Sequence, residues 1–188
     1  MRIISGAHKG RRLESPDWPG VRPTSDRVRE TLFNILAPRI ESARVLDGCA
    51  GTGAVGIEAL SRGAAHVTFV DRDRRATELV ARNLARCGIT DGFVIIRGDL
   101  GSLSTRVPHS VFDLIFLDPP YDTDPVEVMR AVGERLDAEG RLVVEHARRR
   151  AMPPRVGALA EVRRVASGDS VLAFYAREAT GDGNRRDD

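Results

Sequence analysis

A nearly continuous apolar run near the middle of the chain limits the possible folds most strongly. Residues 111–117 read VFDLIFL, and the run stops abruptly at Asp118. A strand of this composition is typical of a parallel sheet whose two faces are both covered by helices, because a strand with one face in water would alternate apolar and polar residues. Asp118 then lies at the carboxyl end of the strand, where open α/β sheets bind ligands.

The rest of the chain alternates between strand-like and helix-like patterns. We expect further parallel strands at 45–47, 67–70, 93–96 and 141–145, helices at 54–62, 76–87 and 126–136, and a closing antiparallel hairpin made of 162–166 and 170–175. This alternation predicts an α/β fold with a doubly wound, mostly parallel, seven-stranded sheet and an antiparallel C-terminal hairpin.

The N-terminal segment is basic. Segments 2–5 and 11–14 predict a small β-hairpin, and Thr24 or Ser25 can cap a helix that ends near Pro38. Two interpretations of the hairpin stay open, a platform for a polyanion and a merely solvated arm. We therefore divide the chain into an N-terminal arm (1–24), a main domain (25–178) and a tail (179–188) that we expect to be disordered.

Composition narrows the class of protein. With 188 residues, 41% of them hydrophobic, the chain can bury one full core, and no apolar run reaches membrane-spanning length. Cys49 and Cys87 both stand in apolar settings, so we expect no disulfide framework and a cytoplasmic protein. The net charge is +2 and Lys9 is the only lysine, so scattered arginines are weak evidence for nucleic acid.

A glycine-rich loop follows the first expected strand. Residues 51–56 fit the pattern G-x-G-x-x-G between a strand and a helix, where glycine lets the backbone approach a ligand closely. Asp71 comes 20 residues after Gly51, at the end of the next strand, where a carboxylate can accept hydrogen bonds from ribose hydroxyls. Taken alone, this pattern predicts a nucleoside-containing cofactor such as NAD.

Two further carboxylates favour S-adenosyl-L-methionine over NAD. Asp47 precedes the glycines by four residues, where it suits an ammonium group and would repel a pyrophosphate. Asp99 ends the third strand, where it can accept from an adenine amino group. The expected cofactor-binding residues are Asp47, Gly48, Ala50, Gly51, Gly53, Asp71, Arg72, Asp99, Leu100 and Asp118.

Residues 118–121 (DPPY) form a plausible clamp for an exocyclic amine. Pro119 and Pro120 stiffen the backbone and lack N–H donors, so nearby carbonyls stay free to accept. The Asp118 carboxylate and the Pro119 carbonyl could orient an NH2 group while the Tyr121 ring stacks on its base. We therefore assign catalysis to Asp118, Pro119, Pro120 and Tyr121.

The order of these motifs resembles that of class I, Rossmann-like S-adenosylmethionine-dependent methyltransferases that modify amines. The stretches RIISGAHKGRRL (2–13) and RPTSDRVRETLFNIL (22–36) are more specific, and on them the chain resembles the RsmD family of 16S rRNA (guanine-N2)-methyltransferases over residues 1–177. The family usually has Leu-Phe where this chain has Gly48-Cys49, so an aromatic side chain is missing there.

The resemblance implies a substrate and partners. These are N2 of guanine 966 in a 16S rRNA hairpin loop, presented by a 30S particle to a monomeric enzyme that uses no metal. The residues it assigns to RNA binding are Lys9, Arg11, Arg12, Arg22 and Arg27.

Two alternatives stay open. One is an adenine-N6 or other amine methyltransferase acting on DNA, which shares DPPY but commonly needs a further recognition domain. The other is an NAD-linked Rossmann protein, or a nucleic-acid binding module, in which DPPY is only a turn.

Overall fold

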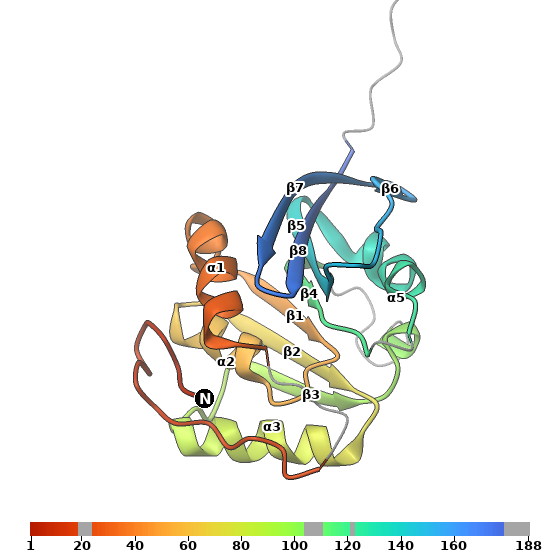
Figure 1. Cartoon of the computed structure of the whole chain (residues 1–188). Coiled ribbons are helices and arrows are strands. Elements are labelled where there is room, and N and C mark those ends of the chain that lie inside the picture. Colours follow the sequence, from red (N-terminus) through yellow and green to blue (C-terminus); the bar gives the residue numbers. More distant parts are fainter. Residues whose placement is uncertain (19–23, 104–110, 121–122, 179–188) are drawn as a thin grey trace, which may run out of the picture.

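The strands form one eight-stranded sheet in the order β3-β2-β1-β4-β5-β8-β7-β6 (Figure 1). The structure is a computed structural model that describes residues 1–18, 24–103, 111–120 and 123–178. The first five strands of this order, β3, β2, β1, β4 and β5, run parallel to one another. Strand β8 lies between β5 and β7 and runs antiparallel to both. The strands are β1 Arg44–Gly48, β2 His66–Asp71, β3 Phe93–Arg97, β4 Phe112–Leu117, β5 Leu136–Ala147, β6 Arg155–Val156, β7 Leu159–Ser167 and β8 Ser170–Arg177.

Helices cover both faces of the sheet. Helices α1, α2 and α3 pack on one face and bury one core cluster, while α5 and η2 pack on the other and bury a second (Figure 1). The helices are α1 Asp26–Leu36, η1 Ala37–Arg39, α2 Ala54–Ser61, α3 Arg74–Cys87, η2 Leu100–Ser102, α5 Pro125–Val132 and η3 Gly133–Arg135. The apolar run at 111–117 is buried on both faces of the sheet, because β4 contributes side chains to both core clusters. The expected doubly wound architecture is confirmed.

The strand order reverses between β1 and β4. From β1 the chain moves outward through β2 to β3, then returns to place β4 on the other side of β1. The two connections therefore leave in opposite directions from the carboxyl ends of β1 and β4, which opens a crevice there. Ligands bind in such crevices in open α/β sheets, so the sheet topology places the candidate site before any side chain is considered.

Two expectations about the C-terminal half were wrong. The sheet has eight strands, not seven, because β6 adds a two-residue pairing that is too short to leave a pattern in the sequence. Leu136 fits the period of the preceding helix, but that helix ends at Val132 and Leu136 opens β5. An irregular register between β4 and β5 lets this early part of β5 pair with Phe112.

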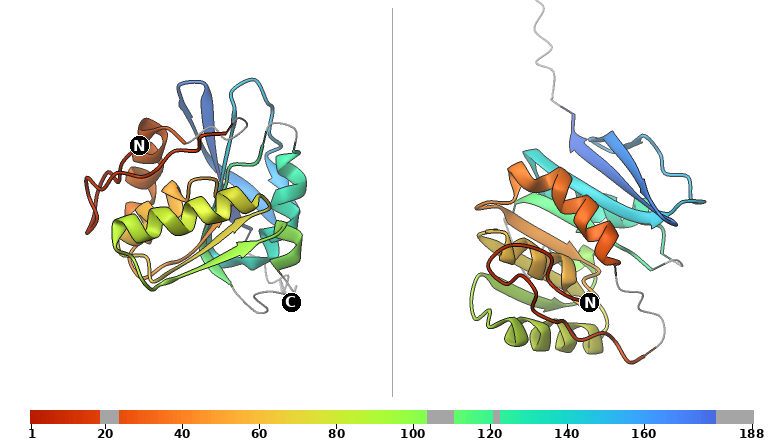
Figure 2. Two further views of the ribbon diagram at one scale, coloured as in Figure 1. Left: turned by 90° about the horizontal axis from the view of Figure 1, so that it is seen from below. Right: turned by 60° about the vertical axis from the view of Figure 1, so that its left-hand side comes forward.

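The N-terminal arm pairs with itself less than expected. In place of two strands there is a single antiparallel bridge between Arg2 and Arg12. The arm is held mainly by the main domain, since Ile3 and Leu13 are buried in the core beneath α1 and α2. Figure 2 shows the arm running along the outside of α2 and α3.

Three expectations fall on residues outside the described part of the chain. These concern Arg22, Tyr121 and the tail at 179–188. Within the described ranges, none of the helices combines the length and apolar character needed to span a membrane.

Candidate active site

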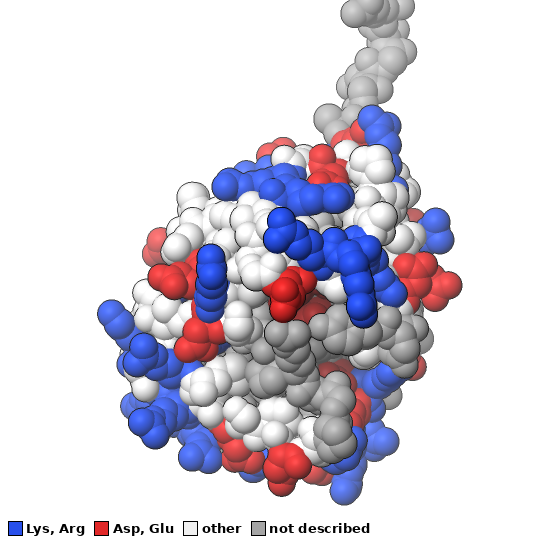
Figure 3. All heavy atoms as spheres, in the orientation of Figure 1, with Lys and Arg blue, Asp and Glu red and all other residues white. Residues whose placement is uncertain are grey.

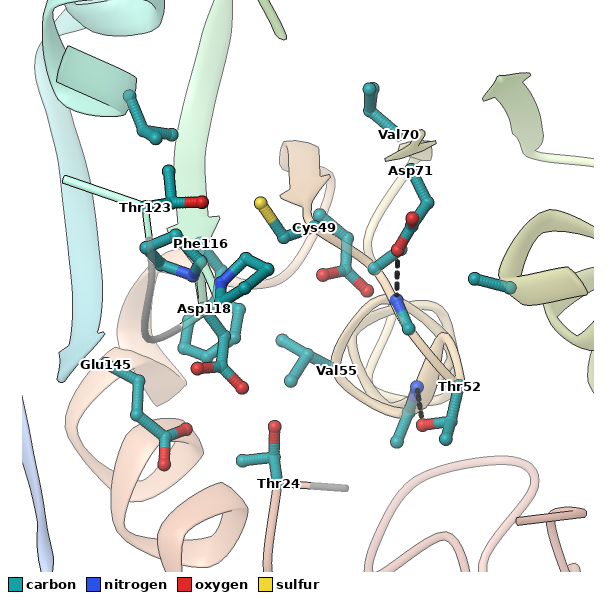
Figure 4. Close-up of a pocket in the computed structure, with 18 of the residues that line it drawn as sticks. Thr24, Cys49, Thr52, Val55, Val70, Asp71, Phe116, Asp118, Thr123 and Glu145 are labelled. Carbon is teal, nitrogen blue, oxygen red and sulfur yellow. Dashed lines mark hydrogen bonds between the residues drawn. The ribbon is translucent and has the colours of Figure 1, made fainter. Parts of the chain in front are cut away.

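A cavity of about 1020 Å³ opens at the carboxyl ends of the parallel strands. It is lined by the loops that follow β1, β2, β3 and β4, and also by the start of α1, by α5 and by the β7–β8 turn. Figure 4 shows side chains from these separate elements converging on one space. This is the edge of the sheet at which the topology reverses, so fold and cavity agree.

The loop after β1 has a backbone that suits close contact with a ligand. Cys49, Gly51 and Gly53 all have positive φ, at 62°, 55° and 75°. The loop is closed by hydrogen bonds from the Ala50 N–H to the Val70 carbonyl at 3.0 Å and from the Gly53 N–H to the Ala50 carbonyl at 2.7 Å. Left-handed backbone favours glycine, and a non-glycine residue there marks a constrained site.

Two of the expected cofactor residues have packing roles and do not line the cavity. A side chain at Gly48 would come within 2.8 Å of Leu117. Gly53 is the N-cap of α2, and a side chain there would meet Val80 at 3.1 Å. The other eight do line it: Asp47, Ala50, Gly51, Asp71, Arg72, Asp99, Leu100 and Asp118.

Gly56, the third glycine of the pattern, holds the helix against the sheet. An added Cβ would lie 2.3 Å from the Phe69 ring, so only glycine fits at this crossing of α2 and β2. The Gly56 N–H donates to Oδ2 of Asp47 at 2.8 Å. The glycine pattern thus fixes the orientation of Asp47 as well as the loop.

Asp47 is almost fully buried, with 2% of its surface exposed. Burial raises the pKa of its carboxyl group to about 7; the Gly56 N–H works against this shift and the Asp71 carboxylate adds to it. A buried carboxyl group at the floor of a cavity favours a cationic partner, which would restore its ionised form. The ammonium-binding role of Asp47 stays a prediction.

Asp71 stands at the end of β2 on the wall of the cavity. Its Oδ2 accepts from the Gly51 N–H at 2.9 Å, as Figure 4 shows. Its Oδ1 accepts from the Asp73 N–H, also at 2.9 Å. Each carboxylate oxygen can accept more than one hydrogen bond. Asp71 can therefore brace the glycine loop and still accept from a ligand hydroxyl.

The third strand end contributes Asp99 and Leu100, which begin η2 and line the same cavity.

Burial raises the pKa of the Cys49 thiol to about 12, and the carboxylates of Asp71, Asp118 and Asp47 act in the same direction. Cys49 is therefore a neutral thiol at physiological pH. No cluster of three or more metal-ligating side chains occurs among the residues that the structure describes.

The expected amine clamp lines the cavity at the end of β4. Asp118 is half-buried, Pro119 is buried and Pro120 is exposed, and all three line the cavity. In Figure 4 the Asp118 carboxylate points into the space shared with Thr24 and Glu145. Tyr121 is outside the described residues, so its stacking role stays a prediction.

The residues expected to bind RNA separate into two places. Lys9, Arg11 and Arg12 are exposed on the N-terminal arm and do not line the cavity, whereas the exposed Arg27 at the start of α1 does. Figure 3 shows basic side chains gathered over the arm and, in a second group, over the region of β5 and β7. The sequence did not single out the exposed Arg148 and Arg149, which follow β5, or the exposed Arg163 on β7.

Hydrogen bonds tie the arm to the cavity wall. The side chain of Asn83, on α3, accepts from the Glu14 N–H at 2.7 Å and donates to the Glu14 and Thr52 carbonyls. Thr52 belongs to the glycine loop and lines the cavity. The buried Asn83 therefore fixes the arm relative to the glycine loop.

Sequence reasoning missed one acidic residue of the cavity that it could have found. Glu145 lies on β5, is 9% exposed and lines the cavity beside Asp118. The rule applied to Asp47, Asp71 and Asp118, an acidic residue where a parallel strand ends, also selects Glu145. The contributions of Trp18 and of the β7–β8 turn had no such signal, because they depend on how distant elements pack.

Comparison with known proteins gives consistent results. A family model described as Conserved hypothetical protein 95 matches residues 1–176. The chain is 37% identical over 187 residues to "Ribosomal RNA small subunit methyltransferase D" of Escherichia coli (strain K12), with 97% of this chain and 92% of that protein covered. It is also 37% identical over 186 residues to "Putative rRNA methyltransferase YlbH" of Bacillus subtilis (strain 168), with 94% and 99% covered.

Solved structures agree with these relatives. The solved structure described as "Putative methyltransferase yhhF from Escherichia coli" superposes on this chain with a TM-score of 0.80 at 35% identity, covering 95% of this chain and 98% of that one. The likeness therefore includes the arm, the sheet and the C-terminal strands.

Proposed function

Because the chain belongs to the conserved hypothetical protein 95 family, which is the RsmD family, we propose that it methylates the exocyclic N2 of a guanine in 16S rRNA with S-adenosylmethionine. One observation carries the proposal. The acidic strand ends Asp47, Asp71 and Asp99 and the Asp118-Pro119-Pro120 turn line one continuous cavity. A cofactor site and an amine clamp within the same cavity are what a methyl transfer to nitrogen requires.

The cofactor half of the cavity fits S-adenosylmethionine. The buried Asp47 carboxyl group, with its raised pKa, would gain from an ammonium group, and Asp71 retains lone pairs for ribose hydroxyls. Asp99 and Leu100 would hold the adenine, the first through its amino group and the second through apolar contact. The Asp47 carboxylate would repel a pyrophosphate, which argues against NAD.

The chemistry needed from the protein is mostly positioning. S-adenosylmethionine, when bound, supplies a methyl group on a positively charged sulfur, and its transfer to N2 leaves S-adenosylhomocysteine and one proton from the amine. An aryl amine is a poor nucleophile because its lone pair is shared with the ring. The Asp118 carboxylate and the Pro119 carbonyl would accept from the NH2 group, hold it still and direct the lone pair away from the ring.

A base can reach this cavity only after it leaves its stack. Loop nucleotides do so at least cost, which favours a hairpin loop such as the one that carries guanine 966. The exposed basic residues Lys9, Arg11 and Arg12 on the rigidly held arm would contact phosphates beside that loop. We place the reaction on an assembled or assembling 30S particle and expect the enzyme to act as a monomer.

The direct test uses small ribosomal subunits from a strain that lacks the modification. The protein is incubated with them and labelled S-adenosylmethionine, and the labelled nucleotide is mapped and its methylated atom identified. We expect one N2-methylguanine, at position 966. Label on adenine, on a ring nitrogen or on no nucleotide would contradict the proposal.

The cofactor is tested separately by calorimetry. S-adenosylmethionine and S-adenosylhomocysteine should bind, and NAD should not. Tight NAD binding, with no binding of S-adenosylmethionine or S-adenosylhomocysteine, would contradict the cofactor assignment and favour the NAD-linked alternative.

A further inference from the structure

Glu145 and Asp118 occupy matched positions on neighbouring strands. Leu117, the last residue of β4, pairs with Val144 of β5 in parallel register, and Asp118 and Glu145 are the residues that follow this pair. Neighbouring strands lie about 4.8 Å apart, and residues at the same level of a parallel pair point to the same face. The register therefore places two carboxylates side by side at the carboxyl edge of the sheet.

Both carboxylates face the same part of the cavity. Each of the two residues lines it, and Glu145 is 9% exposed. Figure 4 shows both carboxylate groups directed into one space, with the Thr24 hydroxyl opposite them. Each carboxylate oxygen can accept more than one hydrogen bond, so two carboxylates side by side can together accept from a ligand that offers two adjacent N–H donors.

Guanine offers such a pair of donors. Its Watson–Crick edge carries N1–H next to the N2 amino group, whereas the corresponding edge of adenine carries a bare N1 acceptor next to N6–H2. A carboxylate opposite N1 would accept from guanine and repel the lone pair of adenine. A site built to pair with a polar group discriminates strongly against analogues that lack it.

Resting on the proposed function, we propose that Glu145 determines base specificity by accepting the N1–H of the target guanine while Asp118 holds its N2 amino group. The two carboxylates therefore have different roles. Asp118 orients the amino group that is methylated, and Glu145 accepts a hydrogen bond only from a base that carries a proton at N1. Glu145 lies beside the reacting amine in this arrangement and contacts only the base.

The test compares two substrates that share the amino group. Small subunits are reconstituted on 16S RNA that carries either guanine or 2-aminopurine at the target position, joined by splinted ligation. 2-Aminopurine keeps the exocyclic N2 amine but has an acceptor at N1. The wild type and Glu145→Gln are then compared by kcat/KM for each substrate, because the glutamine amide can donate to that acceptor.

We expect Glu145→Gln to lower the preference for guanine over 2-aminopurine by about 5- to 150-fold, the range that corresponds to one base-edge contact. The exposed Glu139, at the other end of the same strand, provides the matched control. Glu139→Gln removes the same charge and should leave the preference unchanged. Calorimetry with S-adenosylhomocysteine should give the same affinity for wild type and Glu145→Gln, which shows that the cofactor half is intact.

The possible failures are distinguishable. If the wild type does not methylate the guanine subunits, the proposed function itself is wrong. If it does, two results would overturn the role of Glu145. If Glu145→Gln lowers kcat/KM equally for the guanine and the 2-aminopurine substrates, Glu145 has only a structural role. If it lowers kcat/KM for neither substrate, Asp118 alone accepts from both N–H donors.

Discussion

At the scale of single residues, Asp118 allows the chemical step to be separated from cofactor binding. Asp118→Ala should reduce methyl transfer by about 100-fold or more, because it removes the group that orients the amine. S-adenosylhomocysteine should still bind, since the other strand-end carboxylates remain. Single-turnover transfer and calorimetry on the same variant check both statements.

The control for this prediction is Asp71→Ala, which should show the reverse pattern. Its carboxylate accepts from Gly51 and Asp73 and shapes the glycine loop. Its loss should weaken cofactor binding by about 10- to 100-fold, as expected for hydrogen bonds to a charged group. Normal turnover by Asp118→Ala would mean that the amine clamp is assigned wrongly.

Asp47 should make the stability of the ligand-free protein depend on pH. Burial raises the pKa of its carboxyl group from 3.8 to about 7. The folded state therefore holds this proton more tightly than the unfolded state, and the stabilisation is complete below about pH 4 and lost as pH rises through about 7. The loss amounts to at most about 4 kcal/mol.

Asp47→Asn isolates this effect, because the amide oxygen can still accept from the Gly56 N–H without titrating. The variant should gain stability relative to the wild type between about pH 5 and pH 8. Urea unfolding of both proteins at the two pH values measures the change. If the free energy of unfolding changed by the same amount between the two pH values in both proteins, a raised pKa at Asp47 would be ruled out.

At the scale of secondary-structure elements, Glu58 of α2 joins the arm to two helices. Its buried carboxylate accepts from the backbone N–H groups of Ile4 and Ser5, at 2.8 and 3.0 Å, and pairs with Arg29 and Arg62. Arg29 is also fully buried and donates to the Arg2 carbonyl. One carboxylate thus fixes the arm, α1 and α2 relative to one another.

Glu58→Gln should lower the free energy of unfolding by about 3–5 kcal/mol, because it leaves the buried charge of Arg29 without its full compensation. Amide exchange at Ile4 and Ser5 should also become faster. Glu78→Gln is the control, since Glu78 pairs with Arg74 on the exposed face of α3 and should cost less than about 1 kcal/mol. Similar losses for the two variants would contradict the role of Glu58.

At the scale of the whole molecule, the arm holds basic charge in a fixed place near the C-terminal end of α2, where the Ala7 and His8 N–H groups donate to Ser61. The double variant Arg11→Gln with Arg12→Gln should weaken RNA binding and reduce the salt dependence of the affinity, lowering the slope by about 1 to 2. The measurement is the dissociation constant for the RNA across a series of salt concentrations. An unchanged slope would return the arm to the interpretation as a solvated hairpin.

Arg39→Gln with Arg44→Gln provides the matched control for the arm. Both arginines are exposed, and they lie before or at the start of β1, at the end of the sheet away from the cavity. The control removes the same charge and should leave the salt slope close to that of the wild type. If both double variants lowered the salt slope equally, RNA binding would depend on the net charge of the protein and not on the arm.

The sequence by itself determined the parallel part of the sheet and the chemistry along one edge of it. The doubly buried strand at 112–117, the glycine loop and the acids at Asp47, Asp71 and Asp99 are local patterns, and local patterns are set by which side chains each segment must bury or expose. Because parallel strands present their carboxyl ends together, these local features also predicted that the acids would share a site. The strand count and the end of the helix near Leu136 did not follow, because a bulge and a two-residue pairing leave no periodic signal.

Only the tertiary structure decided which of these residues meet, and what else joins them. The register of β4 against β5 brings Glu145 level with Asp118, and the packing of α1 and of the β7–β8 turn closes the cavity from segments far away in the chain. It also removed Gly48 and Gly53 from the cavity lining and showed them to be packing positions. Register and packing depend on contacts between distant segments, and no local pattern contains them.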